Sequence, residues 1–441
     1  MRVMVVGAGY VGLSTAVVMS AHHDVTVVET DEQKVSSIAS GKPPFYESNM
    51  ESRLKGAVAQ GKLRAVASTS IPEPHDFVIL CVGTPADVSG RVITGYLKEA
   101  VSYIDTNFEG ILDGYLTIVV RSTVPPGTTR SLVLERLARR HEESSFGVVF
   151  NPEFMRQGSA MADITAPDRV ILGASDIRAA AAYRQLISTI LEKPDTPVHE
   201  MSMESAELSK YAANCFLAMK VSFASEISGI AERLPTIRID DVMSAVGADE
   251  RINPSHLKPG LGFGGTCLPK DLVGLISYGH DLGLPMTLLE AVKAVNDMTS
   301  TRIMKLLDRV SPDVRGKKVS VLGLAFKEGT DDTRASQSLQ LITQLVHKGA
   351  KVYVHDPIAA DNNIDPDIRS LIIRCPDLDS CLTGSCAVII MTDWPVYRKT
   401  GLQRLTSRMS AKVVIDGVRA FVDSEIPPEV CYVSLGSHIN C

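Results

Sequence analysis

The chain has 441 residues, of which 45% are hydrophobic and 22% are charged, and its formal net charge is −6. A chain of this length is too long to fold around one ordinary hydrophobic core, so two or three domains are expected. The composition excludes a disordered chain. The acidic balance argues against a general nucleic-acid-binding protein. No apolar run reaches the roughly 18 residues that a membrane-spanning helix needs.

The 8 cysteines are scattered without a Cys-x-x-Cys pair, so no metal site is expected, and this usage is typical of a reducing, cytoplasmic compartment. Residues 1–21 are similar in composition to a signal peptide. Three spaced glycines interrupt that segment, however, and a strand ending in an acid follows it. We therefore expect a cytoplasmic protein whose first residues belong to its fold.

Residues 2–29 predict a strand, a glycine-rich turn, a helix and a second strand. Residues 2–6 and 24–29 are short β-branched apolar runs of the kind found in buried parallel strands. Between them lie Gly-Ala-Gly-Tyr-Val-Gly and a helical stretch that reaches about residue 22. A G-x-G-x-x-G motif alone is weak evidence, but in this context it predicts a dinucleotide site.

The residues of this motif have separate roles. Gly7 and Gly9 allow the tight turn and the close approach of a pyrophosphate, and Gly12 lets the helix pack against the strand. Glu29 ends the second strand, where its carboxylate would accept hydrogen bonds from the ribose hydroxyls and disfavour the extra phosphate of NADP. We therefore expect NAD as the cofactor.

Three further apolar runs predict strands at residues 76–82, 116–120 and 146–150. The polar residues that follow them, each beside Gly or Pro, are Thr84, Thr123 and Glu153. In an open parallel sheet, ligands bind beyond the carboxyl ends of the strands, so we expect these side chains to converge on the cofactor crevice. One such residue alone is more often a cap or a solvated turn residue.

Residues 202–234 contain one glycine and no proline, which predicts a long helix. Lys210 and Asn214 are four residues apart and so project from one face of it. A lysine on a helix surface is normally solvated, but this one lies in an alanine-rich segment that is typical of a buried helix. A buried Lys–Asn pair needs polar partners or a ligand.

Residues 259–271, Pro-Gly-Leu-Gly-Phe-Gly-Gly-Thr-Cys-Leu-Pro-Lys-Asp, form a glycine-rich turn. Its four glycines allow positive φ angles or close approach to a ligand, and they place Cys267 on an exposed turn. A helix that begins near Leu268 or Pro269 would put Asp271 close to Cys267. The pattern predicts that Cys267 is a catalytic nucleophile.

A polar hinge at residues 308–317 precedes a second α/β pattern. Strands are expected at residues 318–323, 351–355, 387–391 and 412–416, with a helix at residues 336–347. This half lacks the full glycine motif. It carries Lys327 and Arg334 beside its first turn, so it could hold a different phosphorylated ligand.

Motifs along nearly the whole chain resemble the UDP-glucose/GDP-mannose dehydrogenase family. They lie at residues 7–12, 81–85, 122–128, 151–156, 167–169, 210–214, 262–271, 323–327 and 331–334. The family oxidises the C6 alcohol of a nucleotide-bound hexose to a carboxylate with two NAD+, one water and no metal. The resemblance implies an α/β fold in which two Rossmann-like doubly wound domains are joined by a central helical domain with one long helix.

The resemblance also implies the roles of three domains. Residues 1–200 are expected to bind NAD, residues 201–310 to form a helical dimerisation domain that carries Lys210 and Cys267, and residues 311–441 to bind the UDP-sugar. A homodimer or higher homo-oligomer is expected, without nucleic-acid or membrane partners. Its place would be in nucleotide-sugar metabolism and polysaccharide biosynthesis.

Site residues follow from the matching positions. The resemblance assigns catalysis to Thr123, Glu153, Lys210, Asn214, Cys267 and Asp271. It assigns cofactor binding to Gly7, Gly9, Tyr10, Val11, Gly12, Glu29, Lys34, Thr84, Thr123, Glu153, Cys267 and Arg334. It assigns substrate binding to Glu153, Phe154, Met155, Arg156, Lys210, Asn214, Gly264, Lys258, Lys327 and Arg251, the last of which would reach a partner subunit's sugar site.

The chemistry of the family explains these residue types. The first hydride leaves C6 and gives an aldehyde, to which the Cys267 thiolate adds. The thiohemiacetal then loses a second hydride and becomes a thioester, which water hydrolyses. Lys210 is placed to stabilise oxyanions at C6 with help from Asn214, and the other catalytic residues resemble groups that position or deprotonate water. Either Lys210 or Asp271 takes the first proton.

Four positions depart from the family pattern. Gln157 stands where the family has Glu, which leaves hydrogen bonding but no acid–base role there. Glu29 replaces Asp, and Thr266 replaces Ser. The family's Asp-Gly-Arg is Asp-Gly-Val-Arg at residues 416–419, which places Arg419 one residue away from the family's nucleotide contact.

Three alternatives share parts of the pattern. Another nucleotide hexose such as GDP-mannose would use the same chemistry, but Pro-Asp-Arg at residues 167–169 resembles the UDP-glucose branch more closely. A one-step hydroxyacid dehydrogenase shares the Lys and Asn but needs no thiol, so Cys267 argues against it. A non-catalytic NAD-binding protein would be expected to lose the catalytic groups, all of which are present here.

Overall fold

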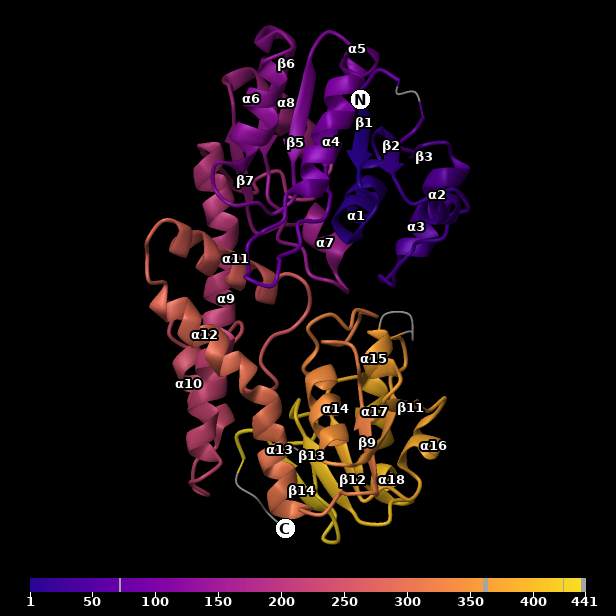
Figure 1. The fold of residues 1–441 in the computed structure, drawn as a ribbon, viewed down its shortest axis with the longest axis vertical. Coiled ribbons are helices and arrows are strands. Elements are labelled where there is room, and N and C mark those ends of the chain that lie inside the picture. The colour runs from indigo at the N-terminus through magenta and orange to yellow at the C-terminus, as the bar shows by residue number, and fades with distance from the viewer. Residues whose placement is uncertain (71–72, 360–363, 423, 438–441) are drawn as a thin grey trace. The chain divides into compact units, whose positions relative to one another are not determined.

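The computed structural model describes residues 1–70, 73–359, 364–422 and 424–437 (Figure 1). The chain divides into two compact units. The N-terminal unit comprises Met1–Ala213 and Val273–Leu282, and the C-terminal unit comprises Asn214–Leu272 and Gly283–Cys441. The expected division into three domains, with boundaries after residues 200 and 310, stays a prediction.

An eight-stranded sheet forms the centre of the N-terminal unit, in the order β3-β2-β1-β4-β5-β6-β7-β8. Neighbouring strands are parallel except β6 and β7. The strands are β1 (Arg2–Val6), β2 (Asp24–Glu29), β3 (Leu63–Ala67), β4 (Phe77–Leu80), β5 (Leu116–Val120), β6 (Phe146–Phe150), β7 (Val170–Ala174) and β8 (Val198–Met201). The order reverses between β1 and β4, where open parallel sheets bind dinucleotides.

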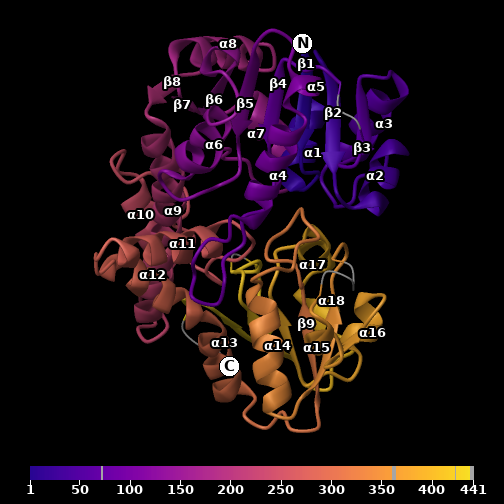
Figure 2. The same ribbon diagram turned by 45° about the horizontal axis from the view of Figure 1, so that its top comes forward.

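Helices cover both faces of this sheet (Figure 2). One face packs against α1 (Tyr10–Met19), α2 (Glu32–Ala39), α3 (Met50–Ala59), α7 (Ala160–Thr165) and α8 (Ile177–Ser188). The other packs against α4 (Gly95–Thr106), α5 (Phe108–Ile111), the π-helix η1 (Arg130–Leu134), α6 (Glu135–Ala138) and the start of α9. A short 3-10 turn, η2 (Glu143–Ser145), precedes β6. Burial on both faces explains why the predicted strands are continuous apolar runs.

A six-stranded parallel sheet forms the centre of the C-terminal unit, in the order β11-β10-β9-β12-β13-β14. Its strands are β9 (Lys318–Leu322), β10 (Lys351–His355), β11 (Ile372–Arg374), β12 (Ala387–Ile390), β13 (Val413–Asp416) and β14 (Cys431–Ser434). The helices around it are α14 (Gln337–His347), α15 (Pro366–Arg369), α16 (Leu378–Leu382), α17 (Pro395–Thr400) and α18 (Leu402–Thr406). The first six strands of the N-terminal sheet follow the same order.

Five further helices form the central helical region: α9 (Met203–Ala231), α10 (Ile239–Gly247), α11 (Leu268–Asp281), α12 (Thr287–Asp297) and α13 (Thr299–Val310). The helices α9 and α11 are continuous across the boundary between the units. The long helix and the two Rossmann-like sheets confirm the expected fold class.

Candidate active site

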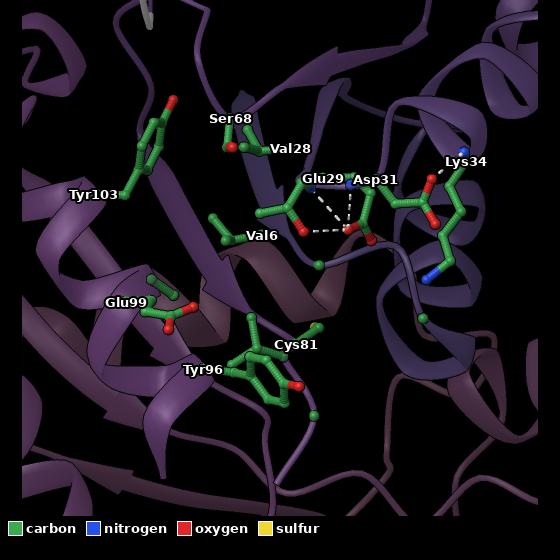
Figure 3. A pocket seen from close by; sticks show the side chains of 16 residues that line it. Val6, Val28, Glu29, Asp31, Lys34, Ser68, Cys81, Tyr96, Glu99 and Tyr103 are labelled. Atoms are coloured by element: carbon green, nitrogen blue, oxygen red, sulfur yellow. Dashed lines mark hydrogen bonds between the residues drawn. The ribbon is translucent and has the colours of Figure 1, made fainter.

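A cavity of about 650 Å³ opens at the carboxyl ends of β1, β2 and β4 (Figure 3). Gly7, Gly9, Glu29 and Lys34, four of the predicted cofactor residues, line it. Figure 3 shows Glu29 and Lys34 on one side of the cavity and Tyr103 of α4 on the other. This volume lies within the range of about 300–1,000 Å³ that is usual for small-molecule and cofactor sites.

The three glycines of the first turn have different surroundings. Gly7 has a φ of +97°, and a Cβ atom there would lie 2.9 Å from the carbonyl oxygen of Cys81. A Cβ at Gly12 would lie 1.9 Å from the carbonyl oxygen of Gly7, so the helix and the turn pack without room for a side chain. At Gly9 no atom lies within 4 Å of that position. The space beside Gly9, at the N-terminus of α1, therefore suits a phosphate group.

Glu29 is held by backbone groups at the end of β2. The Ala8 N–H donates to its Oε2 at 2.9 Å, and the Thr30 N–H donates to its Oε1 at 2.8 Å. Burial works against its charged form, but the backbone hydrogen bonds from Ala8, Asp31 and Thr30 outweigh burial and hold the pKa of Glu29 below its usual value. The carboxylate is thus ionised at neutral pH, as an acceptor for ribose hydroxyls must be.

The loops after β4 and β5 meet. The Thr84 hydroxyl donates to the carbonyl oxygen of Thr123 at 2.7 Å, and the Ser122 hydroxyl donates to that of Val82 at 2.7 Å. Thr84 is buried, so this contact fixes the two loops to each other away from solvent. The loops that carry Thr84 and Thr123 are therefore joined, but neither residue lines the cavity, and their convergence on a cofactor stays a prediction.

Lys210 and Glu153 form a buried pair, with side chains that are 3% and 6% exposed. The Lys210 ammonium donates to the Glu153 carbonyl oxygen and lies 3.4 Å from its Oε1. Its Nζ also lies 4.7 Å from the centroid of the Phe154 ring. The N–H of Met155 donates to Glu153 Oε2 at 2.8 Å. The pair can therefore supply a fixed positive donor and a carboxylate.

Two carboxylates hold the loop that follows β6. Asp163 accepts from the Arg156 N–H at 2.8 Å and from its guanidinium at 2.7 Å. Glu47, which is 5% exposed, accepts from the N–H groups of Gly158 at 2.7 Å and Ala160 at 3.0 Å. Sequence reasoning did not single out Glu47 or Asp163. Arg156 is thus engaged by a carboxylate of the helix α7 that follows its loop.

Cys267 is exposed and directly precedes α11, which begins at Leu268 as expected. The Asp271 N–H donates to the Cys267 carbonyl oxygen at 2.9 Å, so the two residues share one helical turn. The hydrogen bond to Asp332 raises the pKa of Arg334, and smaller contributions come from the charges of Asp332 and Cys267. The guanidinium of Arg334 is thus bound mainly by Asp332, and its charge also interacts with Cys267.

Tight packing explains two of the glycines before Cys267. A Cβ atom at Gly264 would lie 2.6 Å from the carbonyl oxygen of Ala335. Gly265 has a φ of +78°, and its Cβ would lie 2.7 Å from the Phe326 ring. The Gly265 N–H donates to the Arg334 carbonyl oxygen at 3.0 Å. Only glycine lets the turn approach this segment so closely.

Asn296 of α12 holds the same turn and was missed by sequence reasoning. Its Oδ1 accepts from the Phe263 N–H at 2.8 Å, and its Nδ2 donates to the Phe263 carbonyl oxygen at 3.0 Å. A side-chain amide that binds both polar groups of one backbone residue fixes that residue in place. The two residues are 33 positions apart in the sequence, so no local pattern could indicate the contact.

Asp271 is 1% exposed, and both of its carboxylate oxygens have partners. Oδ2 accepts from the Asn214 side chain at 2.6 Å, and Oδ1 lies 2.5 Å from the Lys270 ammonium. The structure thus joins the Asn of α9 to the helical turn of Cys267. Lys270 was not expected in the site.

The other predicted substrate residues lie in the C-terminal unit. Arg251 has a side chain that is 88% exposed, and its Nε donates to Asp249 at 2.9 Å. Lys258 lies 4.0 Å from the carboxylate of Asp393, and Lys327 lies 5.8 Å from the Phe326 ring centroid. Contact between these three side chains and a nucleotide sugar stays a prediction.

Arg419, which is displaced by one residue from the family pattern, is 4% exposed. Its guanidinium pairs with Asp240 of α10 and donates to the carbonyl oxygen of Leu435 and, at 3.2 Å, to the Ser437 hydroxyl. It therefore serves a structural contact inside the C-terminal unit.

Three domain models of one family match the chain in order. Residues 1–191 match the NAD binding domain of the UDP-glucose/GDP-mannose dehydrogenase family, residues 204–298 its central domain, and residues 320–423 its UDP binding domain. The chain belongs to the UDP-glucose/GDP-mannose dehydrogenase family. It is accordingly an NAD-dependent oxidoreductase, and every residue that lines the cavity beside Gly9 and Glu29 lies within the part of the chain that matches the NAD binding domain.

Individual members of the family are similar to this chain over nearly its whole length. The chain is 35% identical to the UDP-glucose 6-dehydrogenase TuaD of Bacillus subtilis, over 95% of this chain and 89% of that protein. A UDP-glucose dehydrogenase structure from Pyrobaculum islandicum is similar with a TM-score of 0.87 and 35% identity, covering 99% of this chain and 98% of that one. A UDP-D-ManNAc dehydrogenase structure from Pyrococcus horikoshii has a TM-score of 0.83 and 25% identity, covering 99% of both chains.

The described residues were also searched for metal sites and for membrane-spanning helices. They contain no group of three or more His, Cys, Asp and Glu side chains that could hold a metal ion. None of their helices is both long enough and apolar enough to cross a bilayer.

Proposed function

We propose that this dehydrogenase catalyses the four-electron oxidation of UDP-glucose at C6 to UDP-glucuronate, with two NAD+ and one water consumed. The observation that carries the proposal is the exposed Cys267 at the start of α11, one helical turn from an Asp271 that binds Asn214. A one-step dehydrogenase needs no such thiol. The named UDP-glucose dehydrogenases, at 35% identity, support the choice of sugar.

Each catalytic residue has its own role in the two oxidations. The alcohol proton passes to Asp271, a carboxylate whose helical turn also carries Cys267 and which binds the Asn214 side chain. NAD+, when bound, accepts one hydride in each oxidation. The Cys267 thiolate attacks the aldehyde carbon, and Lys210 and Asn214 donate to the oxyanion that forms there. Loss of the second hydride leaves a thioester on Cys267.

Hydrolysis releases the product. Water attacks the thioester carbon, the C–S bond breaks, and the carboxylate leaves with the Cys267 thiol restored. Thr123 and Glu153 position that water, since the Thr84 contact fixes the Thr123 loop and Glu153 is held by Lys210. In the C-terminal unit, Lys258 and Lys327 contact the nucleotide sugar.

We also propose that the enzyme is a homodimer and that it acts in the cytoplasm. Its place is in nucleotide-sugar metabolism, where its product supplies polysaccharide synthesis. The side chains of Phe216, Phe223 and Ile230 recur every seven residues on α9 and are 57%, 48% and 51% exposed. Such an apolar stripe is typical of a helix that packs against another chain. In that assembly the exposed Arg251 reaches the sugar site of the partner.

The ratio of NADH formed to sugar consumed tests the proposed reaction. With UDP-glucose we expect two NADH and one UDP-glucuronate per sugar, because the aldehyde stays bound until the second oxidation. Absorbance at the NADH band and chromatography of the nucleotide sugars measure both quantities. One NADH per sugar would contradict the thioester route.

A panel of nucleotide sugars tests the choice of substrate. UDP-glucose should give the highest kcat/KM, above GDP-mannose and UDP-N-acetylmannosamine. The last sugar is included because the similar structure from Pyrococcus horikoshii is a UDP-D-ManNAc dehydrogenase. A higher kcat/KM with either competitor would replace UDP-glucose while keeping the four-electron chemistry.

A further inference from the structure

Glu207 of α9 is a buried carboxylate to which the reaction above gives no role. Its side chain is 0% exposed, and burial raises its pKa. Its Oε2 accepts from the Gly127 N–H at 2.5 Å, and its Oε1 accepts from the Thr129 N–H at 2.7 Å. One side chain thus satisfies two backbone donors of the turn between β5 and η1.

That turn carries Thr123. It leaves β5 at Val120, passes through Thr123, and enters the helical segment that continues as η1. The carbonyl oxygen of Thr123 is already fixed by the Thr84 hydroxyl. Glu207 fixes the other end of the same turn at Gly127 and Thr129. Thr123 is thereby held from both sides.

Glu207 also shares a helix face with Lys210, which is three residues further along α9. Lys210 binds the loop after β6 through Glu153. One turn of α9 therefore binds the Thr123 turn through a carboxylate and the Glu153 loop through an ammonium. The spacing between these two loops is set by a single rigid element.

We propose that Glu207 is a positioning residue that sets Thr123 in register with Lys210 for the reaction at C6. The inference rests on the proposed function. Helix N-termini are ordinarily capped by a neighbouring Ser, Thr, Asp or Asn, whereas here a residue 80 positions away supplies the acceptor. Burying a carboxylate is costly, and here the two backbone N–H donors and the nearby charge of Arg130 offset that cost.

Glu207→Gln tests the inference in the full-length enzyme. The amide has the same shape, but its NH2 group must face one of the two N–H donors, so the turn loses a hydrogen bond and shifts. We expect kcat with UDP-glucose to fall about 100-fold, since displacements of about 1 Å cost that much. The KM for NAD+ should change less than about threefold, because Thr123, although the resemblance also assigns it to cofactor binding, is not among the residues that line the cavity.

The control is Glu204→Gln, one turn earlier in α9. Glu204 pairs with Arg130 at 2.5 Å and makes no contact with Gly127 or Thr129. Its kcat should stay within about threefold of the wild type. Hydrogen exchange of the Gly127 and Thr129 amides gives a readout independent of turnover, and it should accelerate only in Glu207→Gln.

A double-mutant cycle with Thr123→Ala decides the mechanism. If Glu207 acts through Thr123, Glu207→Gln should lower kcat by less than about threefold in the Thr123→Ala background. An equal fall in both backgrounds would overturn the inference, as would unchanged amide exchange. If Glu207→Gln does not fold, Glu207→Asp, which keeps the charge but is one methylene shorter, takes its place in the cycle. A wild type without four-electron turnover would contradict the proposed function instead, and the exchange readout would still test Glu207.

Discussion

The thiol of Cys267 differs from two other cysteine thiols of the chain in its access to solvent. Cys267 is exposed, whereas Cys81 and Cys215 are buried, and burial raises the pKa of each of these two to about 12. Thiols of that kind stay protonated at neutral pH and cannot attack a carbonyl carbon. The exposed thiol of Cys267 has the access to a substrate that a nucleophile needs.

Cys267→Ser should remove four-electron turnover. The serine hydroxyl is not ionised near neutral pH and does not form the thioester, so we expect the kcat for UDP-glucuronate to fall by at least about a thousandfold. Formation of acid and of NADH is measured together. Cys386→Ser is the matched control, because that thiol is 8% exposed and burial raises its pKa. Acid production near the wild-type rate in Cys267→Ser would rule out thioester chemistry.

Among the helices and strands, the elements best predicted from the sequence are those with a distinctive local pattern of residues. The bounds of β1, β2, β5 and β6 match the expected runs, because strands buried on both faces need uninterrupted apolar residues. Three strands of the N-terminal sheet were not predicted. The strand β8, Val-His-Glu-Met, is mostly exposed at the edge of the sheet and so carries no apolar run.

Contacts between distant residues explain what sequence reasoning missed in the site. Glu47 binds Gly158 from 111 positions away, and Glu207 binds Gly127 from 80 positions away. Neither glutamate differs in type or spacing from a solvated residue on a helix or loop. Their roles depend on the fold that brings them to a backbone N–H group, whereas Cys267 stands in a distinctive local motif.

The glycine turn before Cys267 provides a prediction with an internal control. Gly265 and Gly283 both have a φ of +78°, but a Cβ at Gly283 would meet no atom within 4 Å. Gly283→Ala should therefore cost only the backbone strain, about 1 kcal/mol. Gly265→Ala should cost about 2–4 kcal/mol, because its Cβ would also collide with the Phe326 ring.

Urea unfolding measures the free energies, and the same preparations give the rate of acid formation. Gly265→Ala should lose activity because the turn that holds Cys267 must shift, while Gly283→Ala should keep it. Equal destabilisation by the two substitutions would show that close packing does not explain the glycine at position 265.

At the scale of the molecule, the same strand–turn arrangement occurs in both units with different uses. Gly7 and Gly323 have φ angles of +97° and +100°, and each follows the first strand of its sheet. In the N-terminal unit, Glu29 lines an open cavity. In the C-terminal unit, the corresponding Asp356 accepts from the Leu324 N–H at 2.7 Å and, at 3.1 Å, from the Trp394 indole N–H. The carboxylate of Asp356 is thus occupied by hydrogen bonds within its own unit, whereas Glu29 faces a cavity. The two units are therefore suited to different ligands.

The proposed dimer accounts for another property of the whole molecule, the exposed apolar stripe on α9. A charge at its centre would be buried without a partner in a dimer, so Phe223→Asp should weaken association at least about 100-fold. Sedimentation velocity across a concentration series measures this. Activity should fall with dissociation, because Arg251 is proposed to act in the partner's sugar site. Leu371→Asp, at a leucine 42% exposed outside α9, should leave both unchanged. A Phe223→Asp enzyme that sediments and turns over like the wild type would place the subunit contact elsewhere.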